Sequence, residues 1–149
     1  MNIFPLYYLS DLGSTFAGLS GKTSQDFGVG SARYITYSSI FNSSIINTEL
    51  CLPVTVSTEE KQNAVNWGDV LFTGSSETPE EVGVSSVMLE QVSGVYLNSF
   101  CIGFRLNDFE TLLPEFARYL FRANQFKRSL YRYAQGSTRY NLSRSSLLS

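Results

Sequence analysis

Short apolar runs separated by polar segments occupy the first 104 residues, whereas the last third of the chain repeats its apolar positions with a helical period. Strands are predicted at the runs rich in β-branched and aromatic residues, which are 32–37, 50–56, 70–73, 84–89 and 95–104. Pro53 places the second of these strands at an edge or an end of its sheet, because proline cannot donate a ladder hydrogen bond. The apolar segment 3–12 is expected to enter the fold as a strand that leads into a short turn or helix.

One amphipathic helix is predicted over residues 114–134. Apolar residues recur close to every 3.6 positions, at Phe116, Leu120, Ala123, Phe126 and Leu130. Pro114 suits the first position of a helix, and Gly136 suits a C-terminal cap. The apolar stripe is expected to pack on a sheet, with most of the basic residues of the segment lying off that stripe.

Three segments rich in serine, threonine and glycine are predicted as loops: 13–31, 74–83 and 136–141. The first holds five glycines, which favours unusual backbone dihedral angles. Long loops inside a compact domain usually carry function. The whole pattern predicts one α+β domain over residues 1–149, with a twisted, mostly antiparallel sheet and flanking helices.

Composition favours a packed domain in water. Hydrophobic residues make up 43% of the chain and aromatic residues 14%, which is enough for a core. No apolar run approaches the roughly 20 residues of a membrane span, and the N-terminus lacks the basic start of a signal peptide. We therefore expect a cytoplasmic protein with no membrane association.

The chain contains no histidine, which excludes Ser-His and Cys-His triads and removes the commonest zinc ligand. Cys51 and Cys101 lie in apolar segments and are expected to be buried free thiols. The sequence Gly21-Lys22-Thr23 ends like a phosphate-binding loop, but Phe16 stands where that motif needs its first glycine. No catalytic residue, cofactor or metal site is predicted.

The charge is unevenly distributed, although its total is only −2. Residues 1–104 carry three basic and ten acidic side chains, a net charge of −7, whereas residues 105–149 carry eight basic and three acidic ones, a net charge of +5. Seven of those eight basic residues are arginines, which suit bidentate contacts with phosphates and guanine edges. A chain polarised in this way can present a positive face to DNA, although a solvated helix face explains the charge equally well.

The three loops supply groups suited to duplex DNA. Hydroxyls and glycine amides donate to phosphate oxygens, glutamine and arginine read adenine and guanine edges, and glutamate accepts from cytosine. The predicted contacts are Lys22, Thr23, Ser24, Gln25, Tyr34, Ser75, Ser76, Glu77, Thr78, Gln135, Ser137, Thr138 and Arg139. Arg139 is the residue expected to anchor a base or a phosphate, with a salt bridge inside its own loop as the alternative. Tyr34 and Tyr140 could equally be aromatic residues of the core or its rim.

Landmarks of a known family are spread over nearly the whole chain. They are Leu9-Ser10-Asp11-Leu12-Gly13, Gly18-Leu19-Ser20-Gly21-Lys22-Thr23 with Asp26-Phe27-Gly28, Gly68-Asp69-Val70-Leu71-Phe72-Thr73 followed by Ser75-Ser76-Glu77-Thr78, Tyr96-Leu97-Asn98-Ser99-Phe100-Cys101, and Ala134-Gln135-Gly136-Ser137-Thr138-Arg139-Tyr140-Asn141-Leu142-Ser143. As an ordered set they resemble the target-recognition domains of type I restriction–modification specificity subunits, the HsdS family.

This resemblance implies an α+β domain that reads one half of a bipartite double-stranded DNA site and performs no chemistry itself. It also implies a complex with methyltransferase (M) subunits, which carry the S-adenosylmethionine site, and with restriction (R) subunits. Family members usually join two such domains through long helices that set the spacing between half-sites. The sequence ends at Ser149, about where the first of these helices would begin, so we expect one recognition domain without the spacer helix and second domain.

Two other functions stay open at the level of sequence. One is a protein-interaction module whose basic helix docks an acidic partner. The other is a small hydrolase that uses Glu77, Glu80 and Glu81 as paired carboxylates. Adjacent glutamates after a proline, however, more often mark the start of a helix or turn.

Overall fold

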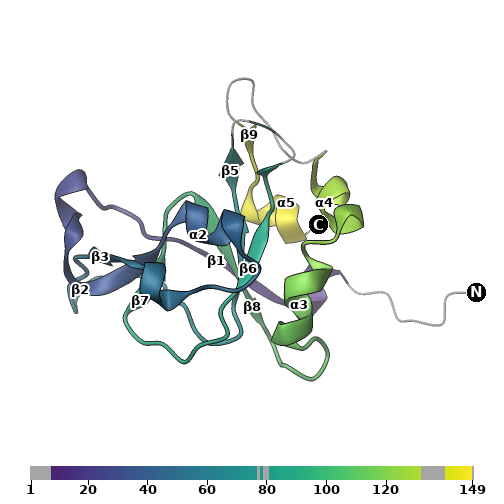
Figure 1. The fold of residues 1–149 in the computed structure, drawn as a ribbon, viewed down its shortest axis with the longest axis horizontal. Helices are drawn as coiled ribbons and strands as arrows, with labels where there is room; N and C mark the ends of the chain where they lie inside the picture. The colour runs from purple at the N-terminus through teal and green to yellow at the C-terminus, as the bar shows by residue number, and fades with distance from the viewer. Residues whose placement is uncertain (1–7, 77, 79–80, 132–139, 149) are drawn as a thin grey trace, which may run out of the picture.

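The computed structural model describes residues 8–76, 78, 81–131 and 140–148, in which strands from distant parts of the chain form three β-sheets (Figure 1). The central sheet has the order β1-β8-β4-β6, formed by Gly13–Ala17, Cys101–Leu106, Val70–Thr73 and Ser85–Val87. A second sheet has the order β3-β2-β7, formed by Leu52–Val54, Phe27–Ile35 and Val95–Leu97. A two-stranded ladder pairs β5, Ser75–Ser76, with β9, Tyr140–Asn141.

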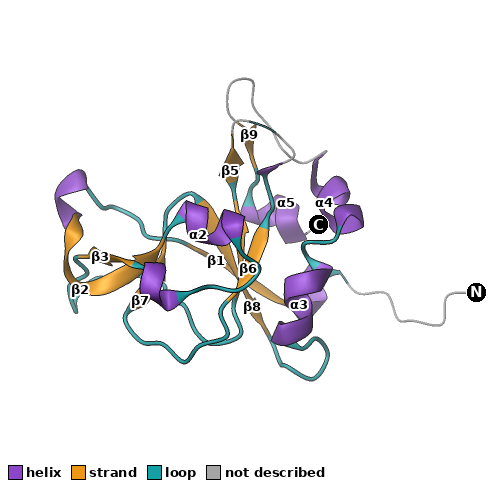
Figure 2. Cartoon of the chain, viewed as in Figure 1, coloured by secondary structure: helices purple, strands orange, loops and turns teal. Residues whose placement is uncertain are grey.

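Short helices surround these sheets (Figure 2). The α-helices are α1 (Leu9–Leu12), α2 (Tyr37–Asn42), α3 (Pro114–Leu120), α4 (Asn124–Tyr131) and α5 (Arg144–Leu148), and the 3₁₀ turns are η1 (Ser24–Asp26) and η2 (Thr48–Leu50). Among the described strands only β2 and β7 pair in parallel. The predicted α+β class with mostly antiparallel sheets and flanking helices is therefore confirmed, and Pro53 lies in β3 at the edge of its sheet as expected.

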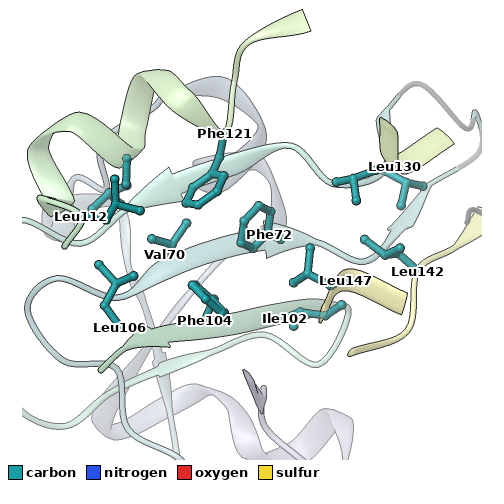
Figure 3. Packing of buried hydrophobic residues seen from close by; sticks show 13 residues of the cluster. Val70, Phe72, Ile102, Phe104, Leu106, Leu112, Phe121, Leu130, Leu142 and Leu147 are labelled. Carbon is teal, nitrogen blue, oxygen red and sulfur yellow. The ribbon is translucent and has the colours of Figure 1, made fainter. Parts of the chain in front are cut away.

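The alternation of side chains along β4 divides the core between the two faces of the central sheet. Val70 and Phe72 point to one face, where residues from α3, α4 and α5 cover them (Figure 3). Leu71 points to the other face, which α2 and the second sheet cover through residues such as Ile35 and Ile40. Side chains of this size each stabilise a fold by about 1.5–3 kcal/mol when fully buried, so the two clusters hold the layers together.

A glycine of β8 makes room for an aromatic ring on this second face. Phe16 of β1 pairs with Gly103 of β8, and its ring lies where a side chain at position 103 would stand. The guanidinium of Arg105 lies over the same ring, 4.7 Å from its centroid. Arg105 also donates to both carboxylate oxygens of Asp69 at 3.0 and 2.8 Å, so β1, β8 and the turn before β4 are tied together.

The prediction of one long loop over residues 13–31 is wrong. Gly13–Ala17 forms β1, which pairs with β8 from Leu106 to Ile102, and β2 begins at Phe27. Gly13 serves close packing here, because a side chain at this position would collide with the carbonyl of Arg105. Glycine content alone does not distinguish this use from a loop. In the entry segment, the expected short helix appears as α1, and residues 3–7 lie outside the described residues.

The predicted helix over 114–134 is two helices, α3 and α4, and its last residues, 132–134, lie outside the described part of the chain. Pro114 is the first residue of α3, as expected. The break comes where Phe121 turns into the core, 1% exposed, and the Arg122 guanidinium bonds to the carbonyl oxygens of Ile40, Phe41 and Ser85.

The predicted apolar stripe is also wrong for α3. Ala117 and Phe121 are buried against the sheet, whereas Phe116 is 56% and Leu120 38% exposed. Leu113 and Tyr119 are also exposed, by 55% and 61%. We call the set of Leu113, Phe116, Tyr119 and Leu120 the outer face of α3. Only the later part of the stripe packs inward: Leu130 is buried, and Phe126 packs on the core.

Candidate nucleic-acid interface

The β5-β9 ladder places the second predicted loop beside the third. Ser75 pairs with Asn141 and Ser76 with Tyr140, and the Leu142 amide donates to the Gly74 carbonyl at 2.8 Å. Leu142 is buried in the same core cluster as Phe72 and Ile102, which anchors this strand (Figure 3). Two segments more than 60 positions apart in the sequence therefore leave the central sheet at the same place.

The hydroxyls at the base of the second loop are structural. Ser75 and Ser76 are each only 4% exposed, and the Ser76 hydroxyl donates to the Glu81 carboxylate at 2.6 Å. The Thr73 hydroxyl donates to the Glu81 carbonyl at 2.8 Å and accepts from the Val84 amide. These bonds close the base of the loop and leave Thr78 exposed.

The first loop, which in the structure covers residues 18–23, is fixed by a polar network. Lys22 donates to Glu60 at 2.5 Å, and its side chain is only 7% exposed. This hydrogen bond from Lys22, followed by those from Gln62 and from the Ser57 amide, lowers the pKa of Glu60 to about 2. The side chain of Gln62 also accepts from the Ser20 amide and donates to the Ser20 carbonyl. Lys22 therefore belongs to a hydrogen-bond network that fixes the loop.

The next three residues of this region present their side chains to solvent. Thr23, Ser24 and Gln25 are exposed, and the Asp26 carboxylate accepts from the Thr23 amide at 2.8 Å, which shapes the η1 turn. The exposed hydroxyl and amide groups lie immediately before Phe27, where β2 begins. Donors in such a turn are suited to phosphate oxygens.

The turn between β7 and β8 is fixed by the side chain of Asn98. The Asn98 side chain, 9% exposed, donates to the Ile35 carbonyl at 3.0 Å and accepts from the Phe100 amide at 2.9 Å. It also contacts the Cys101 thiol at 3.2 Å. This turn holds Ser99 and Phe100 outward, and the Phe100 ring is 59% exposed.

Two adjoining depressions meet at that turn. The first, which we call the aromatic pocket, measures about 350 Å³ and is lined by Phe27, Tyr34, Thr36, Tyr37, Asn98, Ser99 and Phe100. The second measures about 200 Å³ and is lined by Gly74, Ser75, Ser99, Phe100, Cys101, Ile102 and Leu142. Because both depressions share Ser99 and Phe100, they form one continuous surface. We call this surface, together with the exposed residues 23–25 and 78, the recognition surface.

The structure thus brings some predicted contact residues together and gives others internal roles. Tyr34 lies in the aromatic pocket, with its ring edge-to-face against Phe27 at 5.1 Å between centroids, and Ser75 lines the adjoining depression. Lys22 and Ser76 are bound to Glu60 and Glu81. The remaining predicted contacts lie outside the described residues: Glu77, Gln135, Ser137, Thr138 and Arg139.

Sequence reasoning missed the residues of the β7–β8 turn and the pocket walls. Residues 95–104 were expected to form one strand, whereas the structure has β7 and β8 with Asn98, Ser99 and Phe100 between them. The polar pair Asn98-Ser99 inside an apolar run is a turn signal that could have revealed this. Nothing local marks Phe27 or Tyr37 as pocket residues, because chain folding brings them together.

Several basic residues do not contribute to a positive face. Arg105 binds Asp69, Arg122 binds backbone carbonyls, and the Arg118 Nε donates to the Ser44 hydroxyl at 3.0 Å. Among the described residues of 105–131 and 140–148, the exposed cations are Arg128 on α4 and Arg144 on α5, the helices that precede and follow β9. Two further described cations are exposed elsewhere: Arg33 on β2, and Lys61 between β3 and β4.

Both cysteines are free thiols, as predicted: Cys51 is half-buried and Cys101 buried. Burial raises the pKa of Cys101 to about 12, so its thiol is neutral at physiological pH. Among the described residues no three His, Cys, Asp or Glu side chains cluster as metal ligands. No described helix combines the length and apolar character needed to cross a membrane.

Comparison with solved structures identifies the fold. The chain superposes on the S subunit of the type I restriction–modification system from M. genitalium with a TM-score of 0.57 over 95% of its residues, at 13% identity. A structure described for complex assembly and conformational transition of the type I R-M system gives a TM-score of 0.59, 14% identity and the same coverage. The chain spans about a third of each neighbour, 32% and 31%.

No protein-family model matches the chain, and no curated protein sequence does. The similarity is therefore one of fold: the α+β fold found here is that of the type I specificity-subunit structures, as the landmarks of the sequence indicated.

Proposed function

We propose that this chain is a non-catalytic domain that recognises double-stranded DNA within a type I restriction–modification specificity subunit. The observation that supports this function is the recognition surface. The β5-β9 ladder joins the second and third predicted loops, and the turn at Asn98–Phe100 adjoins them, because the Phe100 carbonyl accepts from the Gly74 amide at 3.0 Å. The exposed Arg128 and Arg144 lie on α4 and α5, the helices before and after β9. A polar and partly aromatic surface, with exposed arginines on neighbouring helices of the sequence, suits a duplex.

In this proposal the recognition surface reads one half of a bipartite site. The hydroxyls of Thr23, Ser24 and Thr78 and the side-chain amide of Gln25 contact phosphates or base edges, and the pocket residues contact bases. The proposal includes Lys22, Ser75 and Ser76 as residues that shape the surface, and Glu77, Gln135, Ser137, Thr138 and Arg139 as direct contacts. The chain forms a single domain that directs M and R subunits to the site in the cytoplasm, with S-adenosylmethionine bound by the M subunits alone.

The rival functions find less support in the described side chains. The Glu81 carboxylate accepts from the Ser76 hydroxyl at the base of the loop, a structural role, and Glu77 and Glu80 lie outside the described residues. The helix expected to dock an acidic partner uses Arg118 and Arg122 inside the chain. The outer face of α3 is instead apolar, which suits contact with another protein subunit.

Binding to a short mixed-sequence duplex, measured by fluorescence anisotropy over a salt series, tests the proposal. Affinity should fall as salt rises, because neutralised phosphates release counterions. Gln25→Glu adds a negative charge to the recognition surface and should weaken binding by about threefold or more at low salt. Gln91→Glu is the matched control in the exposed β6–β7 loop and should bind like the unmodified chain. Salt-independent binding, or equal effects of the two substitutions, would contradict the proposal.

A further inference from the structure

The aromatic pocket is lined mostly by aromatic rings, which are not needed to read the edges of a paired base. Four of its lining residues are aromatic: Phe27 and Tyr34 from β2, Tyr37 from α2, and Phe100 from the turn between β7 and β8. Base edges in a duplex groove are read by hydrogen bonds, whereas aromatic faces bind the faces of unstacked bases. The pocket therefore suits a base that has left the stack.

Two of the polar groups that line the pocket, the Asn98 amide and the Thr36 hydroxyl, are bonded within the protein itself. The amide of Asn98 bonds to Ile35, Phe100 and Cys101, and the Thr36 hydroxyl accepts from the Ser39 amide at 3.2 Å. Ser99 is exposed at the rim. A ligand in this pocket would thus be held chiefly by ring contacts, with few hydrogen bonds to discriminate between bases.

The walls are built to stay in place. The Phe27 and Tyr34 rings pack edge-to-face, the Tyr37 ring stacks on Phe41 at 6.2 Å, and the backbone of Phe100 is fixed by Asn98. Preorganised rings lose little conformational entropy when a planar ligand enters. A volume of about 350 Å³ lies near the lower end of the range for small-ligand pockets, which fits a single ring system rather than a larger ligand.

We propose that the aromatic pocket receives one unstacked nucleobase from the bound DNA, between the Phe27–Tyr34 wall and the ring of Phe100. This inference rests on the proposed function, because the pocket forms part of the recognition surface. Unpaired bases already lie partly outside the stack, so they avoid much of the cost of extrusion from a duplex. Base-face contacts are worth enough to change affinity severalfold.

The test compares two duplexes that differ by one unpaired adenine in the centre of one strand. The full chain should bind the bulged duplex roughly tenfold more tightly than the fully paired duplex at the same salt. Phe100→Ala and Tyr34→Leu should each reduce that preference to below about threefold, because both should lose more affinity for the bulged duplex than for the paired one. Phe116→Ala removes an exposed aromatic ring on α3 and serves as the matched control, which should keep the full preference.

A covalent readout covers the case in which a pocket variant folds poorly. With 5-iodouracil at the bulged position, ultraviolet irradiation of the unmodified complex should crosslink the base to Tyr34, Phe27 or Phe100, as mapped by mass spectrometry. Crosslinks elsewhere would overturn the inference, and so would a bulge preference that Phe100→Ala retains. Binding to the paired duplex without any bulge preference overturns the pocket assignment alone. Failure to bind either duplex overturns the proposed function, and this inference falls with it.

Discussion

At the scale of single residues, arginine has two uses in this chain that composition cannot separate. Arg105, Arg118 and Arg122 come from the basic third of the sequence, yet their guanidinium groups bind Asp69, Ser44 and backbone carbonyls. A guanidinium suits a carboxylate inside the protein as well as it suits a phosphate outside it. The positive charge of the C-terminal third was predictable, but its partition between core and surface depends on tertiary contacts.

Asp69 should be among the polar residues that contribute most to stability. Its side chain is 2% exposed, and it accepts from Arg105 twice and from the Asn66 amide at 2.7 Å. Asp69→Ala removes all three bonds and should lower the free energy of unfolding by about 2–3 kcal/mol, since the partly exposed Arg105 recovers some hydration. Urea denaturation would measure this loss. Exposed Glu59→Ala is the control, and an equal change in both variants would contradict the role of Asp69.

Glu60 should titrate far below an ordinary glutamate. Its pKa falls from 4.5 to about 2, chiefly through the hydrogen bond from Lys22, so the folded loop favours the carboxylate. The stabilisation of the loop is therefore complete above about pH 4.5 and is lost as the pH falls towards 2. NMR titration of the Glu60 carboxyl should show the low midpoint. In Lys22→Met the midpoint should rise towards its ordinary value, and an unchanged midpoint would show that Lys22 is not the cause.

At the scale of elements, strand positions were predictable where apolar and β-branched residues occur in short runs. The strand at 70–73 and the extended segment at 50–56 appear where the sequence placed them. Strands that rely on glycine were not predictable: β1 and the start of β2 read as loop, although Gly13 and Gly103 permit close packing. The ladder between β5 and β9 joins residues too distant for any local signal to reveal.

The break between α3 and α4 illustrates the limit of periodicity. Two apolar stripes coexist on this segment, and sequence reasoning chose the one that contains Phe116 and Leu120, which faces solvent. The stripe that packs on the sheet contains Ala117 and Phe121. Hydrophobic period alone cannot rank two stripes of similar strength, because the shape of the sheet decides which one fits.

Alanine substitutions on the two faces of this segment should separate them. Phe121 is 1% exposed and packs on Phe72 and Phe126, so Phe121→Ala should cost about 3–5 kcal/mol of unfolding free energy. Phe116→Ala, on the outer face of α3, should change it by no more than about 0.5 kcal/mol. Thermal and urea denaturation of the two variants provide the comparison. A larger loss for Phe116→Ala would contradict the orientation of α3.

At the scale of the whole molecule, the layers explain how a nearly neutral chain can present a surface for DNA. Helices cover one face of the central sheet and the second sheet covers the other, and β5 and β9 project beyond these layers (Figure 1). The β7–β8 turn adjoins their base, because the Phe100 carbonyl accepts from the Gly74 amide. The exposed Arg128 and Arg144 lie on α4 and α5, the helices that precede and follow β9 in the sequence. Local charge near a bound duplex matters more than the net charge of −2.

The most direct test of the recognition role is the DNA methylation pattern of the source organism, mapped by single-molecule sequencing. Three strains are compared: one with the gene intact, one with the gene deleted, and one in which the deleted gene is replaced by the Tyr34→Ala/Gln25→Ala double variant. Deletion should abolish methylation at one bipartite motif, and the double variant should weaken or relax one half of that motif while the other half stays unchanged. A methylation pattern that is identical in all three strains would contradict the assignment of this chain as the part that reads DNA.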